Sequence, residues 1–281
     1  MSLPLEEIRD QQRATWNKFS PSWKKWDDLN MDLLKPMGDE IIRSINPRGA
    51  EVVLDIAAGT GEPGLTIATM LTGGKVVITD LSEDMLEIAR ENALKRDIKN
   101  IETRVCDVCA LPFADNTFDA ISCRLGFMFF PDMLLAAKEM VRVLKPGGKI
   151  ATSVWNVLEN NFWITAILET ISRHMDLPAP LPGAPGMFRC AKEGLISDLF
   201  LEAGLKNIKQ KEITAKMHFK TADIYWDMMT EVITLVVLAL SNAEDDIKEN
   251  IRKEVYHLLD QKYPDGNILM DSSALLIEGV K

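Results

Sequence analysis

The segment from Glu51 to Leu65 constrains the fold of this chain more than any other part of its sequence. An apolar run ends at the carboxylate of Asp55, and small residues with Gly59 and Gly61 follow before a stretch compatible with a helix. This order is typical of a buried parallel strand, a tight turn and a helix whose N-terminus faces a ligand. Glycines in such a turn let the backbone come close to a bound adenosine or phosphate.

A second apolar strand, Lys75 to Thr79, also ends at a carboxylate, Asp80. Its distance from the first strand suits an acid that accepts hydrogen bonds from both hydroxyls of a ribose. We therefore expect an adenine nucleoside as ligand, and two classes of cofactor compete for the site. Gly59, Gly61 and Gly64 satisfy the dinucleotide pattern, so an NAD(P)-dependent oxidoreductase is one alternative.

The charges near the glycine-rich turn favour the other class of cofactor. Asp55 and Glu62 flank the turn, and no lysine or arginine lies between Glu51 and Lys75. A helix N-terminus binds a pyrophosphate through bare amides and the helix dipole, and neighbouring carboxylates oppose that binding. S-adenosylmethionine carries a sulfonium and an ammonium group and no phosphate. The sequence therefore favours S-adenosylmethionine.

Strands and helices alternate through the first half of the chain. Further strands are expected at residues 101–106, 120–123 and 149–155, and helices at residues 81–90 and 136–144. This alternation predicts an α/β fold with a doubly wound, mostly parallel sheet. Asp55, Asp80, Asp107 and Arg124 all fall at predicted strand ends, so one crevice should collect them, because ligands of such sheets bind outside the carboxyl ends of the strands.

Five motifs in order carry a resemblance to a known family. They are Val53 to Gly61, Thr79 to Leu86, Asp107 with Leu111 to Phe113, Thr117 to Asp119, and Val143 to Lys149. On these motifs the chain resembles a seven-stranded (class I) S-adenosylmethionine-dependent methyltransferase of the group that includes the ubiquinone and menaquinone C-methyltransferases. The resemblance implies a Rossmann-like sheet of seven strands. One departure is Ala57, where the family often has glycine; the extra methyl group bears on how the methionine tail lies.

The resemblance also assigns residues to the donor site. The methionine and ribose side of the donor falls to Asp55, Ala57, Gly59, Gly61, Asp80, Arg124 and Leu125. The adenine falls to Leu81, Met85, Asp107 and Val108. Alternative roles stay open for the charged members: Asp55 and Asp80 could cap the following turns, Asp107 could be only a strand-end acid in a loop, and Arg124 could pair with a neighbouring carboxylate.

Regions outside the core predict a division into three parts. Residues 1–45 form a helical lid, residues 46–155 bind the donor, and residues 156–281 complete the sheet and carry a helical substrate cap. The lid contains Trp16, Trp23 and Trp26 and is expected to break at Ser20-Pro21. The tryptophans either cover the donor or only dock the helices on the sheet. Strands at 208–219 and 273–280 are expected to enclose cap helices at 222–240 and 243–262.

The cap and nearby loops suggest the kind of acceptor. The apolar residues in question are Phe127 to Phe130, Trp155, Phe162, Trp163, Trp226, Met228, Met229, Ile233, Val236 and Val237. They indicate a pocket for a small apolar or aromatic acceptor, although a helix that is apolar on most sides can also simply be buried. No catalytic base is identified, because His174, His218 and His257 lie in no recognisable motif. A non-catalytic, S-adenosylmethionine-binding regulator is a further alternative.

Composition sets the outer bounds. The net charge of −10 argues against a nucleic-acid partner, since such binding depends on neutralising phosphates. Cys106 and Cys109 resemble a metal or redox pair, but no second pair or histidine completes a site, so no metal is expected. The apolar run from Val232 to Leu240 is too short to span a bilayer. We expect a cytoplasmic enzyme acting on a small molecule; its oligomeric state is not set by the sequence.

Overall fold

The sheet of this protein has seven strands in the order β3-β2-β1-β4-β5-β7-β6 in the computed structural model, which describes residues 4–177 and 184–281. The first five strands in the chain are β1 (Val52–Ile56), β2 (Lys75–Asp80), β3 (Ile101–Val105), β4 (Phe118–Arg124) and β5 (Leu144–Trp155). They pair in parallel, whereas β7 (Ile268–Val280) runs antiparallel to β5 and to β6 (Lys206–Phe219). The predicted fold class is confirmed.

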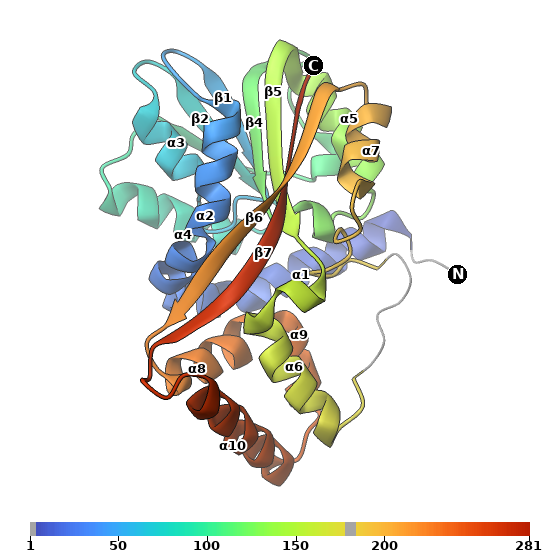
Figure 1. Cartoon of the computed structure of the whole chain (residues 1–281). Coiled ribbons are helices and arrows are strands. Elements are labelled where there is room, and N and C mark those ends of the chain that lie inside the picture. Colours follow the sequence, from blue (N-terminus) through green and yellow to red (C-terminus); the bar gives the residue numbers. More distant parts are fainter. Residues whose placement is uncertain (1–3, 178–183) are drawn as a thin grey trace.

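Helices cover both faces of this sheet (Figure 1). Among the helices that pack on the strands are α2 (Asp27–Ile45), α3 (Gly64–Met70), α4 (Glu83–Lys95), α5 (Met133–Val143) and α7 (Leu195–Glu202). Strands buried on both sides must be apolar throughout, and in β1 Val53, Leu54 and Ile56 are all buried. In α4, Ser82 caps the helix by accepting from the Met85 backbone N–H.

Helix α1 (Leu5–Lys25) crosses the carboxyl ends of the parallel strands, whereas α2 runs along the face of the sheet (Figure 1). Helix α1 continues through Pro21, and the break falls instead at Trp26. The predicted break at Ser20-Pro21 is therefore wrong. Pro21 cannot donate to the carbonyl of Asn17, but the Ser20 hydroxyl donates to that carbonyl at 2.9 Å, so the helix keeps this bond.

The hairpin of β6 and β7 encloses a helical cap, as predicted. Its helices are α8 (Ala222–Val232), α9 (Thr234–Ser241) and α10 (Asp245–Lys262), and α6 (Phe162–His174) packs against α10. These helices gather below the long hairpin (Figure 1). The expected single helix at 222–240 is divided, because Ile233 is extended (φ −83°, ψ 100°) and the two halves meet at 84°.

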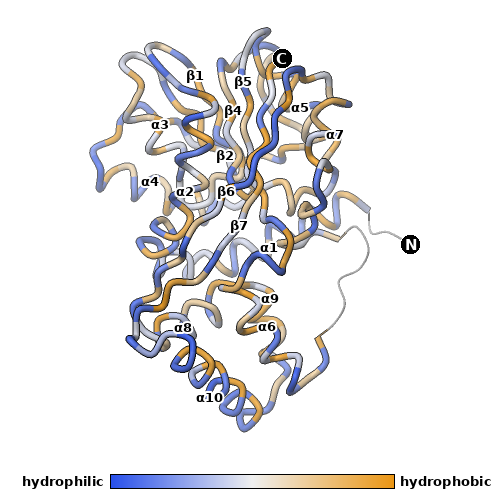
Figure 2. The backbone as a smooth tube through the Cα atoms, in the orientation of Figure 1, coloured by the Kyte–Doolittle hydropathy of each residue, from blue (hydrophilic) through white to orange (hydrophobic). Residues whose placement is uncertain are grey.

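Hydropathy follows the packing of the cap. Helix α10 alternates between hydrophilic and hydrophobic turns in Figure 2, and its apolar side buries Ile251, Val255 and Leu259. Among the described residues no single helix is long and apolar enough to cross a membrane; only α8 and α9 together reach the required length, and they are bent.

Candidate active site

One cavity lies beyond the carboxyl ends of the parallel strands, roofed by α1 and α2 and closed on the far side by the cap. Nine of the eleven residues predicted for the donor site line it: Ala57, Gly59, Asp80, Leu81, Met85, Asp107, Val108, Arg124 and Leu125. The parallel register places these residues at one edge of the sheet although they are spread over the sequence. The remaining two, Asp55 and Gly61, lie outside the lining.

Asp80 is the last residue of β2 and shapes the glycine-rich turn. Its Oδ2 accepts from the Gly59 backbone N–H at 2.9 Å, and its Oδ1 accepts from the Ser82 backbone N–H at 2.9 Å. Burial raises the pKa of Asp80, and these backbone hydrogen bonds oppose the rise. A carboxylate oxygen has room for a second donor, so Asp80 can cap the turn and still accept from a ligand in the cavity.

Asp55 sits beneath the turn rather than at its surface. The side chain is fully buried; Oδ2 accepts from the Gly64 backbone N–H at 2.8 Å, and Oδ1 accepts from the Ser122 hydroxyl at 2.6 Å. Burial raises the pKa of Asp55 to about 7, although the Ser122 and Gly64 hydrogen bonds favour the charged form. The contacts of Asp55 are therefore those of its alternative role, in which the carboxylate caps the turn that follows β1.

Gly61 is fixed by packing on the far side of the turn. A Cβ atom there would lie 2.8 Å from Leu65 Cδ1 and 3.2 Å from Ala89 Cβ, and the backbone φ is +114°. Gly61 therefore lets α3 and α4 approach the turn, and its contacts are within the protein.

Asp107 and its neighbours form another wall of the cavity, beside the end of β3. The Asp107 Oδ1 accepts from the Cys109 backbone N–H at 2.9 Å and caps a short 3₁₀ turn, Val108–Ala110. Met85 is buried at 2% exposure and Val108 at 7%, so their apolar surfaces face the cavity from opposite elements. The arrangement offers one carboxylate oxygen beside two apolar surfaces, which suits a flat heteroaromatic group.

Two residues of the lining hold left-handed backbone conformations that usually favour glycine. Ala57 follows β1 with φ +53°, and Leu125 follows β4 with φ +57°. Gly126 follows Leu125 and lies close to Ala57. A side chain is excluded there, because a Cβ atom at Gly126 would lie only 2.8 Å from Ala57 Cβ. Strained backbone of this kind concentrates at binding sites.

Arg124 ends β4 and carries the only cationic group among the described residues of the lining. Its Nη2 lies 3.3 Å from Met31 Sδ, and no carboxylate of the described residues is within ion-pair distance. Burial lowers its pKa, against the attraction of Glu62, Asp55 and Asp27. The carboxylate-pairing alternative is not realised, so the guanidinium is available to a ligand.

The charges around the turn differ from those expected along the sequence. Glu62 forms an ion pair with Arg96, which comes from the end of α4. The lining nevertheless keeps an excess of acids, with Glu62, Asp80 and Asp107 against Arg124. The cavity is thus poorly suited to a pyrophosphate, because two strand-end acids, Asp80 and Asp107, add to Glu62 of the turn.

The N-terminal helices supply part of the lining. Trp16 and Trp23 of α1 reach the cavity, whereas Trp26 donates its indole N–H to Glu231 of α8 at 2.8 Å. The Trp16 ring packs edge-on against Phe129 with centroids 5.0 Å apart. Two of the tryptophans therefore line the cavity, and the third docks the helix pair on the cap rather than on the sheet as expected.

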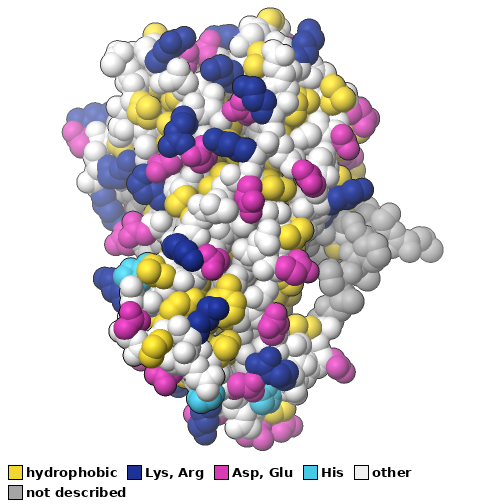
Figure 3. All heavy atoms as spheres, in the orientation of Figure 1, with side chains coloured by type: hydrophobic (Ala, Val, Ile, Leu, Met, Phe, Trp, Pro, Cys, Tyr) yellow, Lys and Arg dark blue, Asp and Glu magenta, His cyan; other side chains and the backbone are white. Residues whose placement is uncertain are grey.

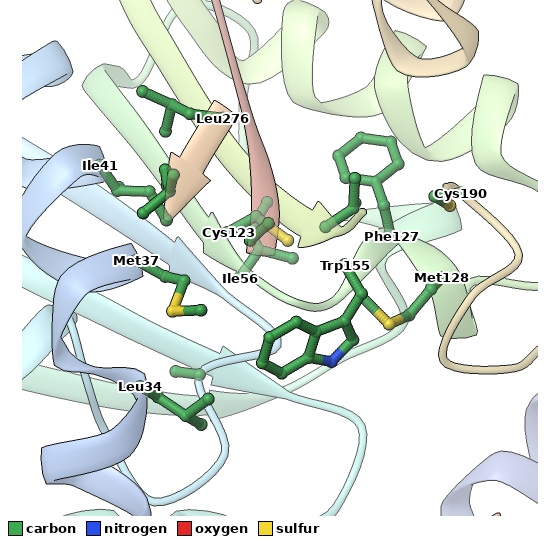
Figure 4. Close-up of a cluster of buried hydrophobic side chains, with 14 of the residues drawn as sticks. Leu34, Met37, Ile41, Ile56, Cys123, Phe127, Met128, Trp155, Cys190 and Leu276 are labelled. Carbon is green, nitrogen blue, oxygen red and sulfur yellow. The ribbon is translucent and has the colours of Figure 1, made fainter. Parts of the chain in front are cut away.

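The end of the cavity nearest the cap is apolar. It is lined by Met128, Phe130, Trp155, Trp163, Met187, Met217, Met228, Val232 and Ile233. Figure 4 shows the Trp155 ring projecting from the end of β5 between Leu34 of α2 and Met128. Of the residues expected here, Phe127, Phe162, Trp226, Met229, Val236 and Val237 do not line the cavity; all of them except Val237 pack in or against the core.

Sequence reasoning missed a group of lining residues that come from α1, α2 and single positions elsewhere. They are Gln12, Asn30, Leu33, Leu34, Thr60, Met187 and Met217. The only signal was Asn30, a polar residue on the otherwise apolar side of α2 that is 2% exposed.

The three histidines lie away from the cavity, whereas Cys106 belongs to its lining. His174 contacts Glu254 at 2.7 Å, His257 contacts Gln261 at 2.8 Å, and His218 is exposed on β6. Cys106 lines the cavity as a free thiol whose pKa burial raises to about 11. On the face shown in Figure 3, basic and acidic side chains are interspersed, with no continuous basic surface.

Comparisons with known proteins agree with this geometry. Residues 53–148 match the family model of a methyltransferase domain. The ubiquinone/menaquinone biosynthesis C-methyltransferase UbiE of Cellvibrio japonicus is 40% identical over 151 residues, which cover 53% of this chain and 61% of the relative. A demethylmenaquinone methyltransferase of Listeria monocytogenes is 30% identical over 148 residues, or 52% and 62% of the two chains.

An uncharacterized protein of Mycobacterium tuberculosis is 35% identical over 155 residues, covering 55% of this chain and 56% of its own length. The matches thus span little more than half the length of these relatives. The solved structure of the YcgJ protein of Bacillus subtilis shares the fold, with a TM-score of 0.56 and 20% identity over 87% of this chain and 97% of that one. The predicted resemblance to class I methyltransferases is confirmed.

Proposed function

We propose that this protein, whose residues 53–148 form a methyltransferase domain, transfers the methyl group of S-adenosylmethionine to a small apolar or aromatic acceptor. The observation that carries the proposal is the single cavity with two unlike ends. Strand-end carboxylates and the glycine-rich turn line one end, and methionines and tryptophans line the other. The two ends bring a polar adenosyl group and an apolar molecule into contact without an intervening wall.

The donor would be held by residues that already line the cavity. Asp80 accepts from the ribose hydroxyls, and Asp107 with the Val108 amide faces the adenine edge, which lies between Leu81 and Met85. Ala57 and Gly59 follow the ribose and the methionine tail, which Arg124 and Leu125 approach. Asp55 acts through its charge and through the turn it supports, since its oxygens already accept from Gly64 and Ser122.

The chemistry requires alignment more than activation. S-adenosylmethionine supplies a methyl group that the sulfonium leaving group already activates. The chain's part is to orient the acceptor in line and to exclude water, and good alignment contributes roughly 7–11 kcal/mol to such reactions. The acidic or basic side chains among the described lining residues are Glu62, Asp80, Cys106, Asp107 and Arg124, and none of them comes from the apolar end. A general base is needed only where the nucleophile must lose a proton.

The three parts of the chain divide this work. Residues 1–45 close the cavity over the donor, residues 46–155 bind the donor, and residues 156–281 form the acceptor wall. The three methionines of that wall, Met187, Met217 and Met228, suit an acceptor of irregular shape, because their unbranched, polarisable side chains adapt to what they contact.

Calorimetric titration with S-adenosylmethionine, S-adenosylhomocysteine and NAD in parallel tests the proposal. We expect the first two to bind and NAD not to bind. A screen of phenols, quinols and amines with labelled donor then identifies the acceptor, and a complete absence of methylation would favour a regulator. Binding of NAD alone would contradict the proposal.

Asp80→Asn is the sharpest variant for the donor site. It keeps the size of the side chain but replaces one accepting oxygen by an amino group, so it loses a charged acceptor for the ribose. We expect S-adenosylhomocysteine to bind about 10- to 100-fold more weakly, since a hydrogen bond to a charged group contributes about 1.5–3 kcal/mol. Thermal melting should show a folded protein; unchanged affinity would remove Asp80 from the site.

A further inference from the structure

The indole N–H of Trp155 has no hydrogen-bond partner among the described residues, although the side chain is only 4% exposed. Trp23 Nε1 is also unpaired, but it is enclosed on all sides, whereas Trp155 Nε1 keeps accessible surface. Because Trp155 lines the cavity, that surface opens into it. In Figure 4 the six-membered ring of the indole lies toward Leu34, and the nitrogen lies on the other side of the ring. Trp155 therefore presents a hydrogen-bond donor to the molecule that occupies the cavity.

The other indole at this end of the cavity already has a partner. Trp163 Nε1 donates to Asn161 Oδ1 at 3.0 Å, and the Trp163 and Trp155 rings pack with their centroids 5.0 Å apart. The methionines and aliphatic residues around them offer no strong hydrogen-bonding group. Thr234, which follows the apolar residue Ile233, adds a hydroxyl that can either donate or accept. The Trp155 N–H is thus the group at this end whose chemistry restricts the ligand.

This N–H restricts the ligand because an indole can only donate a hydrogen bond. A buried donor without a partner is unfavourable and rare in folded proteins. A hydrocarbon has no atom that accepts from it, and a protonated amine has only donors. An oxygen on an otherwise apolar ring accepts from the indole, while the ring itself occupies the space between the methionines. The geometry therefore favours an acceptor of that kind.

We propose that the indole N–H of Trp155 binds an oxygen of the methyl acceptor, so that the protein prefers phenol-like molecules to hydrocarbons and protonated amines of the same shape. The inference rests on the proposed function and deepens it, because it names the class of the acceptor and a residue that selects it. The same N–H favours the ionised form of a phenol, since a hydrogen bond to the charged form stabilises it. A bound phenol then ionises more readily although no basic side chain of the described residues comes from the apolar end.

Two naphthalenes of nearly equal shape test the inference. 2-Naphthol carries an oxygen where 2-methylnaphthalene carries a methyl group. Trp155→Phe removes the N–H donor and keeps an aromatic ring, and any loss of ring contact affects both ligands. By calorimetry with saturating S-adenosylhomocysteine, we expect the ratio of the 2-naphthol affinity to the 2-methylnaphthalene affinity to fall about 10-fold in this variant, the effect of one donor lost from a buried oxygen.

The ionisation of bound 2-naphthol gives a readout that lost packing alone would not move. Absorbance of the naphtholate should show the pKa of the bound naphthol about one unit higher in Trp155→Phe than in the wild type. Trp226→Phe is the matched control, because Trp226 packs against the core outside the cavity lining and should leave the ratio and the pKa unchanged.

A measurement on the wild type alone does not depend on how well a variant folds. Of the indole N–H resonances of the six tryptophans, one should move downfield with 2-naphthol and stay in place with 2-methylnaphthalene. Thermal melting of Trp155→Phe then shows whether the variant that lacks this resonance is folded.

The outcomes separate the two proposals. Wild-type protein that does not bind S-adenosylhomocysteine contradicts the proposed function itself. Wild-type protein that binds S-adenosylhomocysteine but neither naphthalene overturns the inference about Trp155 and leaves the donor site standing. An unchanged affinity ratio and an unchanged pKa of bound naphthol in folded Trp155→Phe would also overturn it, and Trp155 would then be only part of the apolar wall.

Discussion

At the scale of single residues, the acids near the glycine-rich turn differ in what their carboxylates contact. Asp80 lines the cavity, whereas Asp55 is fully buried and holds the turn through Gly64 and Ser122. The burial that removes Asp55 from direct contact is the same burial that raises its pKa to about 7. The residue therefore couples the stability of the fold to pH in a range that is accessible to experiment.

The sign of this coupling follows from the direction of the pKa shift. The pKa of Asp55 in the folded state lies above its ordinary value of 3.8, so the folded state holds the proton more tightly than the unfolded state does. Its contribution to stability is full below about pH 3.8 and is lost as the pH rises to about 7. Asp80 and Asp27, whose pKa values burial also raises, act in the same direction.

Asp55→Asn removes this titration. We expect the free energy of unfolding, measured by urea titration between pH 4.5 and pH 8, to depend less steeply on pH in the variant than in the wild type. Glu254→Asn serves as a control at an exposed ion pair far from the turn. An unchanged slope in Asp55→Asn would mean that the Asp55 proton is not linked to folding.

Ala57 offers a second test at this scale, because its φ of +53° costs an L-residue about 1–2 kcal/mol. Ala57→Gly releases that cost but adds freedom to the unfolded chain, so we expect a gain of about 0.5–1 kcal/mol in the free energy of unfolding. Ala58→Gly, next in the turn and without a positive φ, should instead lose about that amount. Urea titration of the pair measures both signs, and a loss in both would contradict the strain at Ala57.

At the scale of elements, α1 is fastened on both sides of the cavity. Toward the donor side, Ser82 donates to Asn17 at 2.6 Å and Lys24 pairs with Glu91 at 2.7 Å. Toward the cap, Glu231 of α8 accepts from Lys25 at 2.7 Å and from the Trp26 indole at 2.8 Å. The junction of α1 and α2 is thus fixed to the cap by one glutamate.

Glu231→Gln should loosen that junction without unfolding the protein. Partly exposed ion pairs contribute about 0–1 kcal/mol, so we expect a small change in the free energy of unfolding. Hydrogen exchange of the backbone amides at the end of α1 and the start of α2 should become several-fold faster. Glu254→Gln, which breaks the contacts of α10 with Arg173 and His174, is the control and should leave α1 unchanged. Equal exchange in both variants would show that Glu231 does not hold the lid.

At the scale of the whole molecule, the proposed donor and acceptor ends belong to one cavity, and no histidine of the described residues lines it. The pH dependence of methylation should therefore follow the acceptor. With a series of phenols, the rate should rise with the ionisation of each phenol, and the midpoint should move with the phenol's own pKa. His218→Ala should leave these profiles unchanged. One midpoint common to all acceptors would reveal a base supplied by the protein.

The sequence by itself determined the parallel core and nine of the residues that line the cavity at the strand ends. Each of three apolar runs is followed by an acid, Asp55, Asp80 or Asp107, which marks the carboxyl end of a strand. In a parallel sheet these ends lie at one edge, independent of the conformation of the loops. Local patterns also placed the cap between the last two strands. These features depend on residues close together in the chain, which is why periodicity and turn chemistry find them.

Tertiary structure alone decided which groups face the ligand. Asp55 and Asp80 look alike in sequence, yet packing of Ser122 from β4 and Gly64 from α3 buries the first and leaves the second at the cavity. The hydrogen bond of the Ser20 hydroxyl lets α1 continue through Pro21. Arg96, at the end of α4, forms an ion pair with Glu62. Trp23 and Asn30 join the glycine-rich turn in the lining of one cavity only through long-range packing. Such contacts join residues far apart in the chain, and no local pattern records them.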